Sequence, residues 1–250
     1  MNYNICIPIP IKSANISEIK PILDKTVENN PNLIELRFDY INNIQNLSLD
    51  FLKNLKSIIT SNIPVIFTFR DFAEGGQIKI PQKERYKILK MFIKVKPDYI
   101  DIEMNTDQNF LYEFLNLATQ NGVIIIFSYH NFEKTISYNE AIKLITNFNK
   151  KINQEFLKKQ KNYLNNVYKV VLTAQTFDDN IIPLKLCKHF LNSNQKFISF
   201  CMGPLGIFSR IMCVTVGSFL TYASLEEKTA LGQIDIEKMR EIYDLIINDL

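Results

Sequence analysis

Tyr168-Lys169-Val170-Val171-Leu172-Thr173 is typical of a β-strand, because two adjacent valines, a leucine and a threonine favour the pleated backbone. Alternation places Lys169, Val171 and Thr173 on one face of this strand. A lysine in such a position either reaches water or pairs with a carboxylate, or it is buried. Burial in apolar surroundings favours the free amine of a lysine, which is a nucleophile toward ketones and aldehydes. The strand alone leaves a structural lysine and a Schiff-base lysine both open.

Short apolar runs of this kind recur along the 250 residues, with helical patterns between them. Strands are predicted at residues 5–9, 33–38, 65–70, 98–103, 123–130, 169–173, 197–202 and 218–222. Helices are predicted at residues 17–28, 48–60 and 82–95, after the fourth and fifth strands, and at 236–250. Eight strands that alternate with helices favour parallel pairing, and this number in this length favours a closed barrel over an open sheet. No linker divides the chain, so we expect a single (β/α)8 TIM barrel over residues 1–250.

The composition predicts an ordinary globular protein, with 46% apolar and 22% charged residues. A net charge of +3 is too small for a general nucleic-acid binder, and no apolar run is long enough for a membrane span. The lysine- and asparagine-rich segment at 149–166 is interpreted as a solvated helix extension rather than an RNA-binding arm, because no aromatic platform accompanies its charge. The N-terminus has no signal-peptide pattern, so we expect a cytoplasmic protein without nucleic-acid or membrane partners.

Cysteine and histidine usage argues against a metal site. The four cysteines lie mostly in apolar segments without C-x-x-C spacing, so we expect reduced core residues: Cys6, Cys187, Cys201 and Cys213. The chain has only two histidines, His130 and His189, and the second lies in a predicted helix where a structural role is expected. Because no nucleotide-binding fingerprint is present, no nucleotide cofactor is expected.

Several predicted strands carry polar residues, although parallel strands covered by helices should be apolar on both faces. These residues are Glu35, Arg37, Asp39, Thr68, Arg70, Asp101, Glu103, Ser128, His130, Lys169 and Thr173. The side that packs on helices must be apolar, so we expect them to point into the barrel. Buried charges must be paired, and Arg37, Arg70 and Lys169 can pair with Glu35, Asp101 and Glu103. The cluster is either a site at the strand ends, where barrel enzymes keep their chemistry, or a set of structural ion pairs.

Other candidates follow the same strands. Arg37 and Arg70 suit an anionic or polyhydroxylated ligand, and His130 suits acid–base chemistry. The glycines of Glu74-Gly75-Gly76 favour a turn that returns the carboxylate to the barrel mouth, with a plain surface turn as the alternative. Glycines in the segment 202–210 would let backbone amides approach an anion beside Arg210. The segment Thr229-Ala230-Leu231-Gly232-Gln233 could form a flexible lid.

Together these motifs resemble the type I 3-dehydroquinate dehydratases, the Schiff-base enzymes of the shikimate pathway. The resemblance spans nearly the whole chain, and several motifs in one order are more specific than any single one. It is carried by Glu35-Leu36-Arg37-Phe38-Asp39, Phe67-Thr68-Phe69-Arg70, Glu74-Gly75-Gly76, Ser128-Tyr129-His130-Asn131-Phe132, Tyr168-Lys169-Val170, Met202-Gly203, Ser209-Arg210 and Gly232-Gln233.

The resemblance implies a role for each matching residue. Lys169 would form an imine, His130 would be the acid and base, and Glu74 would assist or orient His130. The substrate, 3-dehydroquinate, would be bound by Glu35, Arg37, Arg70, Arg210, Thr229 and Gln233, with Arg210 on its carboxylate. No metal or organic cofactor is implied, and barrels of this family often form homodimers.

The sequence departs from the family pattern at three places. Ala174 precedes Gln175 where a proline is common, Thr229 replaces a usual serine, and Leu231 replaces a proline. Thr229 keeps the hydroxyl, whereas the missing proline before Gly232 would loosen the lid. These changes bear on affinity and rate more than on the type of reaction.

The chemistry of a β-hydroxy ketone suits these residues. A protonated imine at Lys169 is a better electron sink than a ketone, and His130 can remove the adjacent proton and return one to the departing hydroxyl. A class I aldolase with a sugar phosphate at residues 203–206 is one alternative. A barrel that binds a polyol acid without catalysis is the other.

Overall fold

The computed structural model describes residues 3–59, 62–153 and 166–248, and its strands form one parallel sheet. The strands are β1 (Ile5–Pro10), β2 (Leu33–Arg37), β3 (Val65–Thr68), β4 (Tyr99–Glu103), β5 (Ile124–His130), β6 (Val167–Thr173), β7 (Phe197–Met202) and β8 (Thr221–Tyr222). Consecutive strands are neighbours from β1 to β7, and β8 pairs with β1. The amide of Phe219 donates to the carbonyl of Phe197 at 2.7 Å, which links the remaining edges beside β7 and β8. The predicted (β/α)8 barrel is confirmed.

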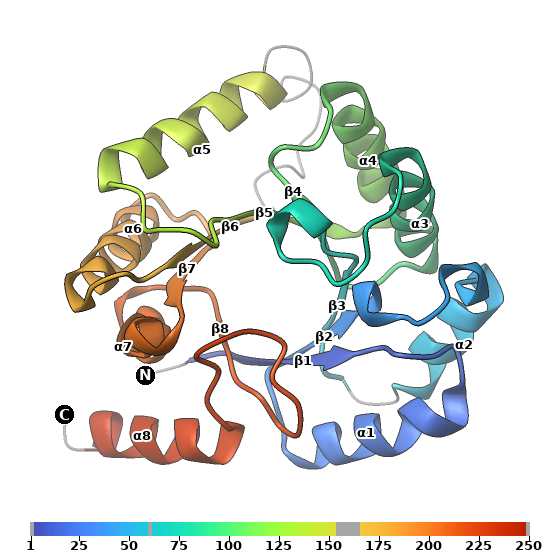
Figure 1. Ribbon diagram of the computed structural model, residues 1–250, viewed down its shortest axis with the longest axis horizontal. Helices are drawn as coiled ribbons and strands as arrows, with labels where there is room; N and C mark the ends of the chain where they lie inside the picture. The colour runs from blue at the N-terminus through green and yellow to red at the C-terminus, as the bar shows by residue number, and fades with distance from the viewer. Residues whose placement is uncertain (1–2, 60–61, 154–165, 249–250) are drawn as a thin grey trace.

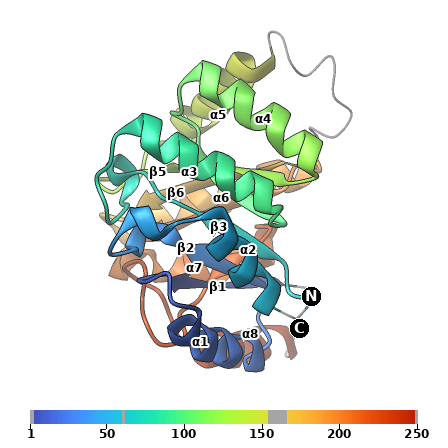
Figure 2. The ribbon, with the colours of Figure 1, turned by 90° about the vertical axis from the view of Figure 1, so that its right-hand side faces the viewer.

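Eight helices surround the strands in the described part of the chain (Figures 1 and 2). They are α1 (Ile16–Glu28), α2 (Leu49–Ile58), α3 (Gln82–Val95), α4 (Gln108–Asn121), α5 (Tyr138–Asn153), α6 (Ile181–Asn192), α7 (Ile207–Met212) and α8 (Ile236–Asn248). Side chains of Asn15, Ser48 and Asp107 accept backbone N–H groups at the starts of α1, α2 and α4. These caps explain why the helices begin where they do. No helix in the described ranges is long and apolar enough to span a membrane.

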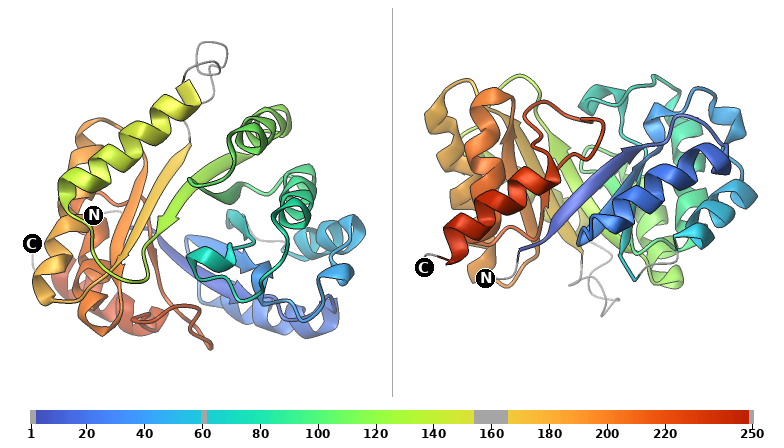
Figure 3. Two further views of the ribbon diagram at one scale, coloured as in Figure 1. Left: turned by 45° about the horizontal axis from the view of Figure 1, so that its top comes forward. Right: turned by 90° about the horizontal axis from the view of Figure 1, so that it is seen from below.

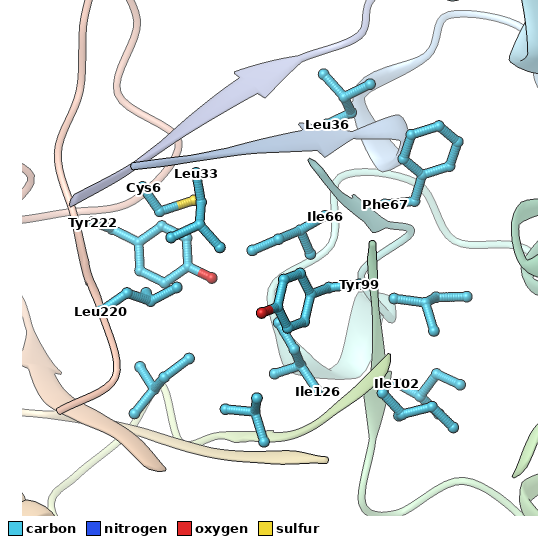
Figure 4. Close-up of a cluster of buried hydrophobic side chains, with 14 of the residues drawn as sticks. Cys6, Leu33, Leu36, Ile66, Phe67, Tyr99, Ile102, Ile126, Leu220 and Tyr222 are labelled. Carbon is cyan, nitrogen blue, oxygen red and sulfur yellow. The ribbon is translucent and has the colours of Figure 1, made fainter. Parts of the chain in front are cut away.

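Strand alternation divides the core into two layers. Figure 4 shows Ile66 on the inner side of β3 and Phe67 on its outer side. Phe67 packs at 5.4 Å between ring centroids against Phe92 of α3. The inner layer includes Tyr99 and Tyr222, which turn into the space that the strands enclose (Figure 4). The four cysteines are buried and free, as predicted.

Two predicted strands are shorter by two or more residues in the structure because hydrogen bonds to groups outside the sheet replace the ladder. β3 ends at Thr68, and the amide of Arg70 donates to the Asp39 carboxylate instead. In β8 only two residues pair, since the amide of Ser218 bonds to the carbonyl of Cys213. The predicted helix extension at 149–166 is described only to the end of α5, and residues 154–165 lie outside the described ranges, as do 249 and 250 at the end of the closing helix.

Candidate active site

A cavity of about 590 Å³ opens at the carboxyl ends of the strands. Every residue predicted to act lines it: Lys169, His130, Glu74, Glu35, Arg37, Arg70, Arg210, Thr229 and Gln233. The segment between β8 and α8 closes one side, and the right-hand view of Figure 3 shows it rising above α8 at the end toward which β1 points. This is the end at which barrel enzymes carry their chemistry.

Lys169 lies inside the ring of strands and is only 4% exposed. Its Nζ is 3.1 Å from Oδ2 of Asp101, 3.0 Å from the hydroxyl of Tyr222 and 4.0 Å from Oε1 of Glu35. The lysine therefore does not extend to bulk water. Lys169 pairs with a carboxylate, as expected of a structural lysine, and it is also buried and faces the cavity, as a Schiff-base lysine requires. Its position is therefore compatible with both interpretations.

The Glu74 turn brings the carboxylate onto His130, as predicted. A short 3-10 helix, η3 (Phe72–Glu74), ends at Gly75, which has a φ of +85°. Oε2 of Glu74 accepts the backbone N–H of His130 at 2.9 Å and lies 3.0 Å from its Nδ1. A Cβ on Gly75 would lie 2.1 Å from the Phe132 ring, and one on Gly76 would lie 2.2 Å from the Arg70 carbonyl. Glycine is therefore required at both positions of this turn.

The electrostatics favour a neutral imidazole. Burial, followed by the charges of Arg70 and Lys169, lowers the pKa of His130 well below its ordinary value. Burial and the Glu103 carboxylate raise the pKa of Glu74 to about 8. With Nδ1 held by Glu74, the other ring nitrogen is the one available for proton transfer.

Arg70 is paired on both sides of its guanidinium. It contacts Asp101 at 2.7 Å and Glu103 at 2.8 Å, and it donates to the Ser128 hydroxyl at 2.7 Å. Burial opposes the charge of Asp101, but Arg70 and Lys169 outweigh it and hold the pKa of this carboxyl well below its ordinary value. The acidic residues around Arg70 thus have cationic partners, and the described ranges contain no cluster of three or more His, Cys, Asp or Glu side chains that could hold a metal ion.

The predicted pairing of Arg37 was wrong in detail. Its guanidinium forms two 2.8 Å hydrogen bonds with Asp39 rather than with Glu35, Asp101 or Glu103. Asp39 lies just beyond β2 in the 3-10 helix η1 (Phe38–Tyr40), so its side chain turns back onto Arg37. Thr173, which was expected to point into the barrel, is not among the residues that line the cavity, and its hydroxyl donates to the Asn131 carbonyl.

Arg210 differs from the other guanidiniums. It is 1% exposed, yet no carboxylate of the described residues is among the charges that act on it. Its Cζ lies 4.4 Å from the centre of the Phe200 ring, one terminal nitrogen donates to the Leu231 carbonyl at 3.2 Å, and Nε has no hydrogen-bond partner among the residues that the structure describes. Burial lowers the pKa of Arg210 to about 10. A buried cation without a counter-ion is suited to an anionic ligand.

The predicted anion loop after β7 does not present its glycine amides. The amide of Gly203 donates to the Leu231 carbonyl, and that of Gly206 donates to the Gly203 carbonyl. The positive φ of Gly203, +84°, starts a 3-10 turn in which the Gly203 carbonyl accepts the Gly206 amide. The glycine part of that prediction was wrong, whereas Arg210 lines the cavity as expected.

Residues 228–233 line the cavity, and hydrogen bonds join Gln233 to Thr229 and Ala230 within this segment. Oε1 of Gln233 accepts the amides of Thr229 and Ala230 at 2.7 and 3.3 Å, and Nε2 of Gln233 donates to the Thr229 hydroxyl at 3.2 Å. The threonine therefore keeps a hydroxyl at this position of the cavity wall. That the segment opens and closes as a lid stays a prediction.

Sequence reasoning missed some residues of the site. Tyr222, Tyr40 and Gln77 line the cavity, and Arg85 pairs with Glu103 behind Arg70. Tyr222 stands at the end of the last predicted strand, which was an available signal, but tyrosine is common in strands for packing reasons alone. Arg85 lies in α3, and a helical arginine gives no sequence sign that it reaches the barrel interior. His189 lies in α6 beside the Tyr138 hydroxyl and away from the cavity, as predicted.

Comparison with known proteins agrees with the resemblance. Residues 5–249 match the family model described as type I 3-dehydroquinase. A 3-dehydroquinate dehydratase of Methanobrevibacter smithii is 31% identical over 245 residues, which cover 97% of this chain and 96% of that protein. The crystal structure of the 3-dehydroquinate dehydratase from Aquifex aeolicus is 25% identical, with a TM-score of 0.74 and coverage of 97% and 98%. The enzyme from Geobacillus kaustophilus, at 21% identity, shares the fold with a TM-score of 0.84 and coverage of 99% and 92%.

Proposed function

Since this chain belongs to the type I 3-dehydroquinase family, a family of hydro-lyases, we propose that it removes water from 3-dehydroquinate through an imine on Lys169. The product is 3-dehydroshikimate. The observation that carries the mechanism is the buried amine of Lys169 in the same cavity as the Glu74–His130 pair. One side chain can bind a carbonyl carbon covalently, and the other can move the proton beside it.

The reaction proceeds in steps that these residues can perform. Nζ of Lys169 adds to the ketone, and loss of one water molecule leaves a protonated imine. His130 then takes the proton from the adjacent carbon, and the electron pair moves toward the imine nitrogen. The pair returns to form the carbon–carbon double bond as the β-hydroxyl departs with a proton from His130, as water. Hydrolysis of the imine releases the product and restores Lys169.

Two kinds of contact hold the substrate. The unpaired guanidinium of Arg210 binds the carboxylate, because it alone among the cavity arginines has no acidic partner in the described residues. Glu35, Thr229 and Gln233 supply hydrogen-bonding groups for the ring hydroxyls. Arg37 and Arg70 are held by carboxylates and contribute their remaining N–H groups.

The two alternatives are less favoured. An aldolase would need its sugar phosphate held at residues 203–206, but the amides of Gly203 and Gly206 are already bonded to carbonyl groups. A barrel that only binds a polyol acid would not need a buried lysine in the same cavity as an imidazole with a lowered pKa. The role in the shikimate pathway and the homodimer follow from the family resemblance, and the cytoplasmic location follows from the sequence pattern; all three stay predictions.

Borohydride trapping tests the proposal. Reduction in the presence of 3-dehydroquinate should leave one covalent adduct on Lys169, and Lys169→Ala should lose both the adduct and the ultraviolet signal of the conjugated enone product. Lys228→Ala is the matched control, because Lys228 lines the exposed rim of the same cavity. A Lys169→Ala variant with normal turnover would refute the imine.

A further inference from the structure

Tyr222 contacts the reacting nitrogen from β8, and no step described so far uses its hydroxyl. The hydroxyl accepts an N–H from Lys169 at 3.0 Å, and Nζ lies 4.6 Å from the centre of the tyrosine ring. Tyr222 is 4% exposed and lines the cavity. Figure 4 shows its ring inside the barrel with the hydroxyl directed toward the interior.

The two acceptors on Lys169 fix the direction of its lone pair. A neutral amine on a lysine has two N–H bonds and one lone pair. Asp101 at 3.1 Å and Tyr222 at 3.0 Å can accept both N–H bonds. Asp101 is itself held at 2.7 Å by Arg70, so this acceptor cannot turn away freely. The lone pair is then left for a carbonyl carbon in the cavity, which is the orientation that attack requires.

We propose that the Tyr222 hydroxyl orients the Lys169 amine and carries a proton from its nitrogen to the substrate's carbonyl oxygen during imine formation. This role rests on the proposed function. Attack forms the nitrogen–carbon bond and moves the carbon–oxygen π pair onto oxygen, leaving a positive nitrogen and a negative oxygen. Tyr222 accepts one proton from that nitrogen and gives its own to that oxygen. The product is a neutral carbinolamine, and the tyrosine is unchanged.

Relay through a hydroxyl has a geometric advantage. Direct transfer from nitrogen to oxygen passes through a strained ring of four atoms: nitrogen, hydrogen, oxygen and carbon. With the tyrosine oxygen and its proton included, the ring has six atoms and near-linear hydrogen bonds become possible. Burial, followed by the Glu35 carboxylate and the Cys6 thiol, raises the pKa of Tyr222 well above its ordinary value. The hydroxyl therefore keeps its proton until the relay.

Tyr222→Phe removes only this hydroxyl, and Tyr99→Phe is the matched control. Tyr99 is also a buried tyrosine of the barrel interior, on β4, but it does not line the cavity (Figure 4). Each protein is mixed with 3-dehydroquinate, quenched with borohydride at successive times and weighed by intact mass spectrometry. We expect the adduct to form about tenfold or more slowly in Tyr222→Phe, to reach the same extent on Lys169, and to form at the wild-type rate in Tyr99→Phe.

A solvent isotope effect separates the relay from a structural role. Two protons move in the relay, so the rate of wild-type adduct formation should be lower in D₂O than in H₂O. In Tyr222→Phe the rates in the two solvents should be similar, and its free energy of unfolding in urea should stay close to that of wild type. Adduct formation in Tyr222→Phe within twofold of wild type, with the isotope effect retained, would overturn the role of Tyr222 and leave the imine on Lys169 intact. Failure of the wild-type chain to form any adduct would remove the proposed function and this role together.

Discussion

Replacing Arg210 with methionine should make the empty protein more stable and the enzyme much less active. Burial lowers the pKa of Arg210 from its ordinary value to about 10, which corresponds to a burial cost of about 3 kcal/mol. Methionine fills a similar volume without charge, although the hydrogen bond to Leu231 and the contact with the Phe200 ring are lost, at about 1 to 2 kcal/mol together. The free energy of unfolding should therefore rise by about 1 to 2 kcal/mol.

Activity should change in the opposite direction. Two charge-assisted hydrogen bonds to a substrate carboxylate contribute about 3 to 4 kcal/mol, so kcat/KM should fall by about 10² to 10³. Urea unfolding without substrate gives the first quantity, and the rate of enone formation gives the second. Arg210→Lys is the control, since it keeps the charge but loses the planar fork: its kcat/KM should be intermediate and its stability should not rise. A methionine variant that loses more than about 1 kcal/mol, or keeps kcat/KM within threefold, would refute the assignment of Arg210 as an unpaired cation that binds the carboxylate.

Three further outcomes are expected from the Glu74–His130 side of the cavity. His130→Ala should still form the borohydride adduct on Lys169 while turnover falls about a hundredfold or more, and wild-type turnover would exclude His130 from the reaction. Because the pKa of Glu74 is raised to about 8, the folded chain holds a proton that the unfolded chain has released, so this site destabilises the fold increasingly as pH rises toward 8. The free energy of unfolding, measured with urea, should fall by roughly 2 kcal/mol between pH 6.5 and 8 in wild type and by less in Glu74→Gln. Below about pH 6.5 the lowered pKa of His130 has the opposite effect on this free energy, so the comparison starts there. Equal pH dependence in the two proteins would contradict the raised pKa of Glu74. Gly75→Ala should lower both stability and kcat. Gly122→Ala is the control, because Gly122 has a similar φ of +72° but nothing within 4 Å of the new Cβ; it should lower stability by about 1 kcal/mol and leave kcat unchanged. Equal effects of the two substitutions on kcat would show that the Gly75 turn does not position Glu74.

The fold was predictable because each strand and helix has its own local pattern. Alternating apolar runs at regular spacing are enough to identify parallel strands, and their number fits a closed barrel. Strand ends were less predictable. Phe69 and Arg70 were predicted to belong to the third strand, but β3 ends at Thr68. The Arg70 amide bonds instead to Asp39, which is distant in sequence. A side chain that replaces a ladder partner leaves no periodic signal.

The inward direction of the polar residues was also predictable, because helices must cover the outer face of the strands. Their partners were not. Arg37 bonds to Asp39, two residues away, and Glu103 is shared by Arg70 and by Arg85 from α3. The sequence also does not predict whether a glycine amide is free to bind a ligand. Gly203 has a positive φ, but its amide bonds to the Leu231 carbonyl. Such choices depend on the distances between segments that the sequence does not specify.

The three cavity arginines illustrate why pairing, rather than residue type, decides a role. Arg37 and Arg70 are each held by carboxylates at 2.7 to 2.8 Å, so their charge is largely neutralised before any ligand arrives. Arg210 has the same side chain and is buried more deeply, but its guanidinium has no ion pair with a carboxylate of the described residues and contacts a carbonyl and an aromatic ring. An incoming carboxylate gains most where the protein has already desolvated a cation without neutralising it. The carboxylate should therefore lie on the Phe200 side of the cavity, with the ketone toward Lys169, and this asymmetry would allow only one orientation of the substrate.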